Sequence, residues 1–439
     1  MISTKQMWAL TGTATLLALA AGAANTIGCT VNTTSPADGG SGSSSGSSTS
    51  SSGSTSSSGS TSSSGSSSGS GSGSGSDAGS GSGSDSGSGS GSESGAGSGG
   101  EAGPPTDAGG DAGFCFSGAS PVAGETLVAL ACGQTSPSGI AVHDGVVYWT
   151  DYAAAGTVMS EPETGGPITT LAINQDWPYA IAVDDNNVYW TNYDSQSAPG
   201  GGSGTSGTVQ KLALGGGSTP ITIASGLQGP ASIAIDATNV YFGQTVGGTV
   251  KMVPIASTGS TTPTVLASGG QSPYGMAAQN GILYWTNYTG TTANGSASVM
   301  SVSVSGDGGA PKILTQASNA TGAYGIAVNT TAIFFTAQNN TGTATEVETM
   351  PLAGGNPLVL APGQLQATGI AIDGTSVYWT DWDPNNGTVS SQPFPTGSTP
   401  GAITVLAKSS DEPLAIAVDS TGIYYTASGG GRVWRLTPP

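Results

Sequence analysis

Few side chains in this sequence could act as acid or base catalysts. His143 is the only histidine among 439 residues, and it stands in a turn between the apolar runs Ile140-Ala141-Val142 and Val146-Val147. A general base or a metal site built on it would have no histidine partner, and no paired inner carboxylates accompany it. We therefore assign His143 a structural role and expect no enzyme activity. A metal-dependent hydrolase or lactonase is the alternative.

A second group of side chains could bind a ligand. Aromatic and acidic residues recur in the segments that lead into runs such as Ala180-Ile181-Ala182-Val183. A Gln-x-x-Pro theme, as in Gln175–Pro178, predicts a repeated turn there, and that turn does not require these side chains. Aromatic rings with a few acids can form a binding mouth, whereas the alternative is ordinary, partly exposed loop residues. The candidate ligand-binding residues are Asp176, Trp177, Tyr179, Tyr274, Tyr324, Asp411 and Glu412.

One loop has a weak calcium-binding pattern. Asp381, Asp383 and Asn385 place oxygen ligands at alternate positions, as calcium loops do. The bidentate Glu that ends a calcium-binding loop is missing, and Gly387 stands one position later than the glycine of such loops. An ordinary turn is therefore the alternative. We expect no cofactor.

These candidates belong to a repeat built on Tyr148-Trp149-Thr150-Asp151. A period of 41 to 52 residues is typical of β-propellers. Each repeat has four short runs rich in β-branched and aromatic residues, separated by Gly, Asp, Asn and Pro, which predicts four strands, a to d. The seven copies of the motif begin at residues 148, 189, 241, 284, 334, 378 and 424.

The strand order predicts how the ring closes. A further d-type run, Thr126 to Ala131, precedes the first strand a, and the chain ends just after the last strand c. We expect an all-β propeller over residues 114–439, with seven four-stranded blades closed by the N-terminal strand. The d-to-a and b-to-c loops then share one face, which carries the candidate mouth. His143 lies in an a-to-b hairpin on the other face.

Three further features of the repeat have expected structural roles. Strand a begins with Gly, Ala or Ser because inner strands crowd around the axis. The paired aromatics of strand b alternate across the strand, so one should point to each neighbouring blade. The turn after strand a carries an Asp or Asn that can hydrogen-bond its own turn. These turn residues are Asp184, Asp236, Asn329, Asp373 and Asp419.

Residues 126–437 resemble the YWTD-type propellers of the low-density-lipoprotein-receptor class B group and their bacterial TolB-like relatives. The resemblance rests on the motif copies given above, which are complete only at 148–151 and 378–381. It implies the fold and says little about function. The usual ring of that family has six blades, so a six-bladed ring with an irregular copy at Tyr241 or Phe334 is the alternative.

The N-terminal segment predicts export and anchoring. Residues 1–28 have an apolar core of signal-peptide length, and Thr26-Ile27-Gly28-Cys29 resembles the lipobox of bacterial lipoproteins, with Thr26 where Leu is usual. The resemblance implies lipidation at Cys29 and a place on the outer membrane or cell surface; the alternative is a periplasmic or secreted protein. Residues 29–113 are a Ser/Gly-rich linker too polar to fold, and therefore a disordered tether.

Cysteine usage predicts a disulfide, and the charge limits the classes of partner. Cys115 and Cys132 remain as a pair in an exported protein, so we expect a disulfide between them. The net charge is −19, and the seven Lys and Arg residues are scattered, which argues against nucleic-acid binding. We expect a monomeric, lipid-anchored binding or scaffold module whose loop face meets a protein, glycan or envelope polymer.

Overall fold

The computed structural model places the propeller part of the chain in one compact unit. The predicted signal peptide, tether, lipidation site Cys29 and disulfide partner Cys115 lie outside the described residues, so they stay predictions. None of the described residues forms a helix with the length and apolar character needed to cross a membrane. The structure describes residues 119–122, 125–193, 204–214, 219–269, 271–288, 296–304, 310–318, 322–338, 344–409 and 411–437.

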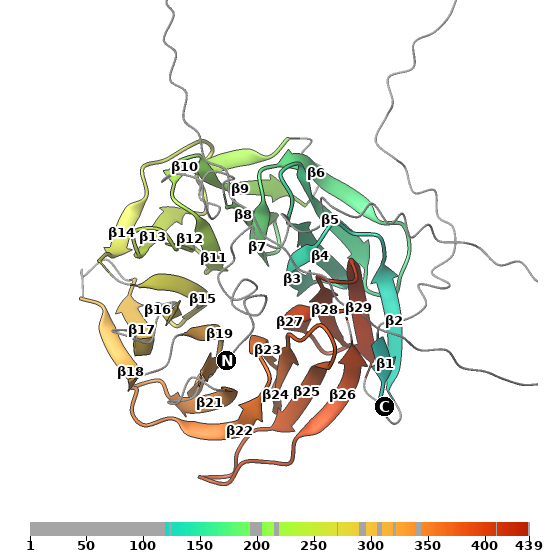
Figure 1. The fold of residues 1–439 in the computed structure, drawn as a ribbon. Helices are drawn as coiled ribbons and strands as arrows, with labels where there is room; N and C mark the ends of the chain where they lie inside the picture. Colours follow the sequence, from blue (N-terminus) through green and yellow to red (C-terminus); the bar gives the residue numbers. More distant parts are fainter. Residues whose placement is uncertain are drawn as a thin grey trace, which may run out of the picture. The chain divides into compact units, whose positions relative to one another are not determined.

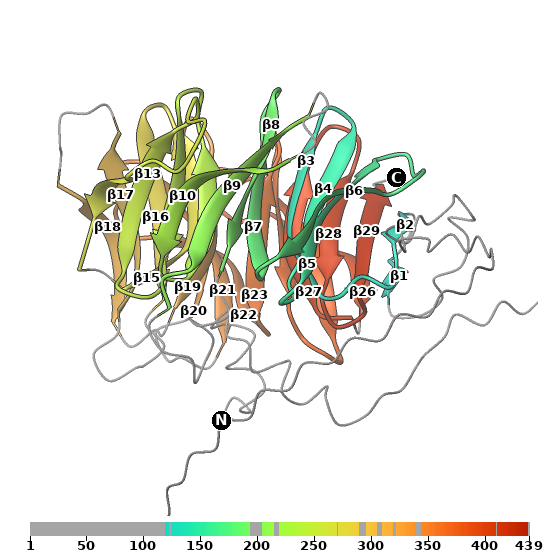
Figure 2. The same ribbon diagram turned by 90° about the horizontal axis from the view of Figure 1, so that it is seen from above.

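Seven antiparallel sheets stand as blades around a central axis (Figure 1, Figure 2). The copies at Tyr241 and Phe334 build regular four-stranded blades, so the predicted seven-bladed ring is confirmed and the six-bladed alternative is wrong. In blades 1 to 6 the chain runs from the inner to the outer strand. Blade 1 is β3 (Pro137–His143), β4 (Val146–Asp151), β5 (Gly156–Pro162) and β6 (Thr169–Gln175); blade 2 is β7 (Pro178–Val183), β8 (Asn187–Asn192), β9 (Gly207–Ala213) and β10 (Ile221–Leu227). Blade 3 is β11 (Pro230–Ile235), β12 (Asn239–Gln244), β13 (Thr249–Pro254) and β14 (Thr264–Ala267); blade 4 is β15 (Ser272–Gln279), β16 (Ile282–Tyr288), β17 (Ser296–Ser303) and β18 (Lys312–Ser318). Blade 5 is β19 (Ala323–Val328), β20 (Ala332–Gln338), β21 (Thr345–Pro351) and β22 (Leu358–Gln364); blade 6 is β23 (Ala367–Ile372), β24 (Ser376–Asp381), β25 (Gly387–Pro393) and β26 (Thr404–Ser409).

Blade 7 closes the ring with strands from both ends of the propeller sequence. Its inner strands are β27 (Pro413–Val418), β28 (Ile423–Ala427) and β29 (Arg432–Thr437). Strand β2 (Thr126–Ala131) pairs with β29 and completes the sheet, with Thr126 opposite Thr437. The predicted closure by the N-terminal strand is confirmed.

A short strand that the sequence does not predict precedes this closure. Strand β1 (Ala119–Pro121) pairs antiparallel with β26 and makes blade 6 five-stranded (Figure 1). Val122 continues the contact by donating its N–H to the Leu406 carbonyl at 3.0 Å. The N-terminal segment therefore contacts the outer edge of blade 6 before it completes blade 7.

The paired aromatics of strand b fill the interfaces between blades. In blade 1, Tyr148 packs with Val188 and Trp190 of blade 2, whereas Trp149 packs with Tyr424 of blade 7. Both rings are buried. The prediction that the two aromatics point to opposite neighbours is confirmed.

The threonine of the motif joins the inner strands of adjacent blades. Thr150 Oγ1 accepts the Gly139 N–H at 3.0 Å and donates to the Tyr179 carbonyl of blade 2 at 2.7 Å. The inner strands are so close that a Cβ on Gly139 would lie 2.4 Å from that carbonyl oxygen, which confirms the expected crowding. The same two-sided bridge recurs at Thr286, Thr336, Thr380 and Thr426.

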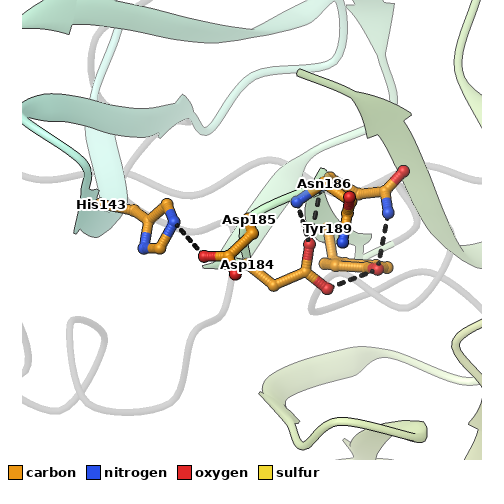
Figure 3. Close-up of polar contacts among 6 residues, drawn as sticks. His143, Asp184, Asp185, Asn186 and Tyr189 are labelled. Carbon is orange, nitrogen blue, oxygen red and sulfur yellow. Dashed lines mark hydrogen bonds and ion pairs between the residues drawn. The ribbon is translucent and has the colours of Figure 1, made fainter. Parts of the chain in front are cut away.

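The face formed by the a-to-b hairpins, called here the hairpin face, carries the predicted turn residues. Asp184 Oδ1 accepts the Asn186 N–H at 2.8 Å, and Oδ2 accepts the Tyr189 hydroxyl at 3.0 Å (Figure 3). The turn bonding was predicted, and the bond to the motif tyrosine is additional. It recurs at Asp236–Tyr241 and Asp373–Tyr378, whereas Asn329 caps its turn in the blade that has Phe334.

Candidate functional site

The d-to-a and b-to-c loops meet on the face opposite the hairpins, called here the loop face. The Tyr152 N–H donates to the Ser136 carbonyl at 3.0 Å, which ties the two loops of blade 1 together. The same bond joins Trp382 to Gln366 at 2.9 Å in blade 6. The predicted sharing of one face is confirmed.

Residues just before the inner strands have left-handed backbone conformations on this face. In four blades the residue before the first proline of strand a has positive φ: Ser136 (88°), Trp177 (55°), Gly229 (59°) and Glu412 (60°). Glycine adopts this conformation without strain, whereas it costs other residues roughly 1–2 kcal/mol. Only blade 3 uses glycine there. Two of the strained residues, Trp177 and Glu412, are candidates from the sequence.

Trp177 and Tyr179 belong to an aromatic cluster between blades 1 and 2, which also contains Tyr152 and Tyr193. The ring centroids of Tyr152 and Trp177 are 4.8 Å apart, and those of Tyr152 and Tyr179 are 5.5 Å apart. Trp177 is only 8% exposed. The rings pack against one another at contact distance, so they form a wall rather than an open platform.

Tyr274 and Tyr324 lie in a second aromatic cluster, together with Tyr288, on blades 4 and 5. Tyr324 is fully buried. A hydrogen bond of 2.8 Å between the Tyr179 and Tyr274 hydroxyls connects the two clusters across blade 3. Burial raises the pKa of both phenols well above its usual value, so both remain protonated at neutral pH.

The three acidic candidates do not form one group with these rings. Asp411 is buried and makes an ion pair with Arg432 of the same blade. Glu412 is half-buried and accepts the Ser428 N–H through its carbonyl at 3.2 Å. Asp176 is half-buried beside Tyr152, whose pKa is raised by burial and then by Tyr193, Tyr274 and Asp176.

Sequence reasoning missed three of the clustered tyrosines. Tyr152, Tyr193 and Tyr288 are each the first residue after a motif copy, and Trp382 takes the same place in blade 6. Alignment of the copies one residue beyond their end would have shown this recurrent aromatic position. That position lies at the end of strand b or at the start of the b-to-c loop, and it supplies side chains to both aromatic clusters.

The glutamine of the repeated d-to-a turn also has a role beyond the turn. Gln175 Oε1 accepts the Trp190 Nε1–H at 3.0 Å and the Asn192 Nδ2–H at 3.0 Å in the next blade. Gln134 binds Trp149, and Gln364 binds Trp379, in the same way at 3.0 Å. Each bond ties the outer strand of one blade, or in the case of Gln134 the turn that follows it, to strand b of the next.

Two carboxylate oxygens of the loop with the weak calcium pattern accept hydrogen bonds within the chain, whereas Asp381 Oδ1 is buried without a partner among the described residues. Asp383 Oδ1 accepts the N–H groups of Asn385 and Asn386 at 2.8 and 2.7 Å, as in a tight turn. Asp381 is 4% exposed and accepts the Thr388 hydroxyl at 2.9 Å. Within the described ranges, no group of three or more His, Cys, Asp or Glu residues could hold a metal ion. The calcium hypothesis stays a prediction.

His143 lies on the hairpin face, as the register predicts. Its Nε2 is 3.0 Å from Asp185 Oδ1, and this contact joins the hairpins of blades 1 and 2 (Figure 3). The Asp185 side chain is 88% exposed. His143 therefore takes part in a surface contact between blades, on the face opposite the aromatic clusters.

No protein-family model and no curated protein matches the chain. Among solved structures, virginiamycin B lyase from Staphylococcus aureus is 16% identical, with a TM-score of 0.55 over 72% of this chain and 99% of that one. Hydrazine synthase from Kuenenia stuttgartiensis is 13% identical, with a TM-score of 0.52 over 69% of this chain and 95% of that one. A chain of a nidogen/laminin complex is 20% identical, with a TM-score of 0.42 over 56% and 89%. Identities this low establish the fold alone.

Proposed function

We propose that this protein is an exported binding or scaffold module, anchored to the cell envelope through a lipid on Cys29. Its loop face binds a protein, a glycan or an envelope polymer. The tether of residues 29–113 would hold the propeller away from the membrane, with a root-mean-square reach of about 50 Å if it behaves as a Gly-rich coil.

The left-handed loop residues carry this proposal. Gly229 shows that glycine fits this position of the repeat, yet Trp177 and Glu412 keep large side chains there against a conformational cost. Strain of this kind clusters at ligand-binding sites because the side chain is needed where the backbone places it. The hairpin face, in contrast, repeats one set of turn bonds in blades 2, 3 and 6. Its left-handed residues Asp144 and Asn280 stand in two-residue hairpin turns, where Asp and Asn adopt this conformation readily.

Co-sedimentation of the full-length protein with isolated envelope fractions tests the proposal. Purified peptidoglycan sacculi and outer-membrane vesicles serve as probes, and binding is measured with wild type and two charge-reversal variants. Asp176→Lys alters the loop face, and Asp185→Lys makes the same change at an exposed site on the hairpin face. We expect the first variant to bind at least several-fold more weakly and the second to bind like wild type.

Equal loss in both variants, or in neither, would contradict binding at the loop face. The anchor is tested separately: Cys29→Ser should move the protein from the membrane fraction to the soluble exported fraction. Thermal unfolding with a chelator and with added calcium addresses the metal-dependent alternative, since a site that binds only the folded state must raise the midpoint.

A further inference from the structure

The loop-face half of the central channel contains a cavity of about 210 Å³. The first residues of six inner strands line it, and none of the lining residues is charged. Tyr179 and Tyr274 form part of its wall, and Leu414 lies on the side provided by blade 7. Ser138 and Thr368 add two hydroxyl groups to those of the tyrosines, and the other lining residues are Gly, Ala, Ile and Leu.

The two phenols in this wall have one more donor than their mutual bond uses. Each hydroxyl carries one proton, and a single hydrogen bond of 2.8 Å joins the two oxygens. One phenol donates in that bond, so the proton of the other is still available. The described residues provide no second partner for either hydroxyl. Both tyrosines are half-buried in the cavity wall, and a ligand acceptor in the cavity would take up the unused donor.

The size and charge of the cavity restrict what could supply that acceptor. A cavity of about 150 Å³ holds benzene, and sites for drug-sized ligands begin near 300 Å³, so this cavity suits one or two small rings. No charged side chain lines the cavity, so an ion there would give up part of its hydration without a counter-charge. The acceptor must therefore belong to an uncharged, mainly apolar molecule.

We propose that the channel binds a small uncharged ring compound whose carbonyl oxygen accepts a hydrogen bond from the Tyr179–Tyr274 pair. The ring occupies the apolar part of the cavity beside Leu414, and the carbonyl group faces the two phenols. This site is independent of the loop-face partner proposed above, because it lies inside the channel. Its occupancy is measured with a small molecule and not with envelope fractions.

The test compares two probes of nearly the same shape. Acetophenone carries a carbonyl oxygen, and α-methylstyrene carries a methylene group in its place. Saturation-transfer difference NMR and titration on the full-length protein measure binding of each. We expect acetophenone to bind about five to ten times more tightly, which is the effect of one hydrogen bond. Equal affinity of the two probes, or no binding of either, would overturn the proposal.

Variants locate the bound probe. Tyr179→Phe and Tyr274→Phe each leave one phenolic donor, so either alone should weaken acetophenone binding by no more than about threefold. The double variant should remove the five- to tenfold preference over α-methylstyrene. Leu414→Trp should fill the cavity and abolish binding of both probes. Tyr148→Phe removes a hydroxyl from strand b outside the channel and should bind both probes like wild type; a matching loss there would contradict the assignment.

Discussion

Asp373 and Asp381 flank strand β24 at its two ends, and their carboxyl groups have opposite properties. Asp373, on the hairpin face, accepts the Thr375 N–H at 2.6 Å and the Tyr378 hydroxyl at 2.8 Å. Burial works to raise the pKa of Asp373, but these and further hydrogen bonds hold the pKa below its usual value. The Asp373 carboxylate is therefore an ionised anchor for its turn.

Asp381, at the loop-face end of the same strand, is a buried carboxyl group with fewer hydrogen bonds. Burial raises its pKa to about 6, against weaker opposing hydrogen bonds from Thr388 and from the backbone at Gln366. Asp151 has the same position in blade 1, and burial raises its pKa to about 6 as well. Asn192 and Asn287 take this position in blades 2 and 4.

The comparison shows that the two faces of the propeller use their polar residues differently. On the hairpin face one arrangement, a turn aspartate bonded to the motif tyrosine, recurs because it holds the hairpin and strand b together. At the loop face the residue type changes from blade to blade, and several residues are held in unfavourable states. Asp144 and Asn280 on the hairpin face are also left-handed, but Trp177 and Glu412 are residue types that rarely adopt this conformation. Varied residue types and such strained positions are typical of a binding surface on a rigid scaffold.

The sharpest test of the hairpin-face anchor is Asp373→Ala. The variant loses two backbone bonds and the bond to Tyr378, and it leaves their donors without this acceptor. We expect a loss of about 3 kcal/mol in the free energy of unfolding, measured by urea denaturation at pH 7. Asp185→Ala, at an exposed carboxylate on the same face, should change the free energy of unfolding little.

The pH dependence of that loss checks its cause. Because the folded-state pKa of Asp373 is lowered, its stabilising contribution is full above the unfolded-state pKa of about 3.8 and disappears as pH falls through the folded value. The difference between wild type and Asp373→Ala should therefore shrink in acid. A difference that stays constant down to low pH would mean that the carboxylate charge does not hold the turn.

Asp381→Asn should have the opposite sign. The folded-state pKa of Asp381 is raised from 3.8 to about 6, so its contribution to stability is full below about 3.8 and is lost as pH rises through about 6. Asparagine removes the cost of the buried charge, and at pH 7 the variant should be more stable by about 2–3 kcal/mol. Urea denaturation at pH 4 and pH 7 measures this, and the gain should be nearly absent at pH 4.

A gain of the same size at both pH values would contradict burial of a charge as the cause. Asp185→Asn, at the exposed carboxylate, is the matched control and should change stability little at either pH. If Asp381→Asn destabilises the protein at pH 7, the two ends of β24 are alike and the comparison fails.

Gln175→Leu tests the bonds that tie neighbouring blades near the loop face. The variant leaves the Trp190 and Asn192 side-chain N–H groups buried without their acceptor, and we expect a loss of about 2 kcal/mol in urea denaturation. Gln271→Leu is the matched control, because Gln271 Oε1 is buried without a partner among the described residues. The control should be neutral or stabilising; equal losses would assign the effect to packing alone.

Much of the fold could be predicted from the sequence because two patterns indicate the same architecture. The spacing of the motif copies is typical of a propeller, and the alternation of side chains within each copy is that of a β-strand. The motif copies fix strand b, and Gly, Ala or Ser at the start of strand a follows from crowding such as that at Gly139. The turn role of Asp184 followed from its place in the hairpin. Strand β1 was missed because Ala119–Pro121 is only three residues long and has no β-branched side chain.

The candidate site was less predictable because its arrangement depends on contacts between blades. Sequence spacing brought Trp177 and Tyr179 to the correct face, but it could not show that a hydrogen bond joins Tyr179 to Tyr274 of another blade. Nor could it show that Tyr324 is fully buried or that Asp411 is paired with Arg432. These features depend on how far each side chain reaches across the channel and the blade interfaces.

Glycine substitutions at the left-handed loop residues should have the smallest effect on the free energy of unfolding, and they test most directly whether backbone strain is connected with binding. Ser136→Gly and Glu412→Gly both place glycine at a positive φ, where each variant should gain up to about 1 kcal/mol in urea denaturation. Ser136→Gly should leave sedimentation with envelope fractions unchanged, whereas Glu412→Gly should reduce it, because only Glu412 is a candidate binding residue. Gly229→Ala should lose stability, since a Cβ there would lie 2.7 Å from Thr245 Oγ1. If Glu412→Gly is more stable and binds as well as wild type, strain at this face has no connection with binding, and the loop face differs from the hairpin face in regularity alone.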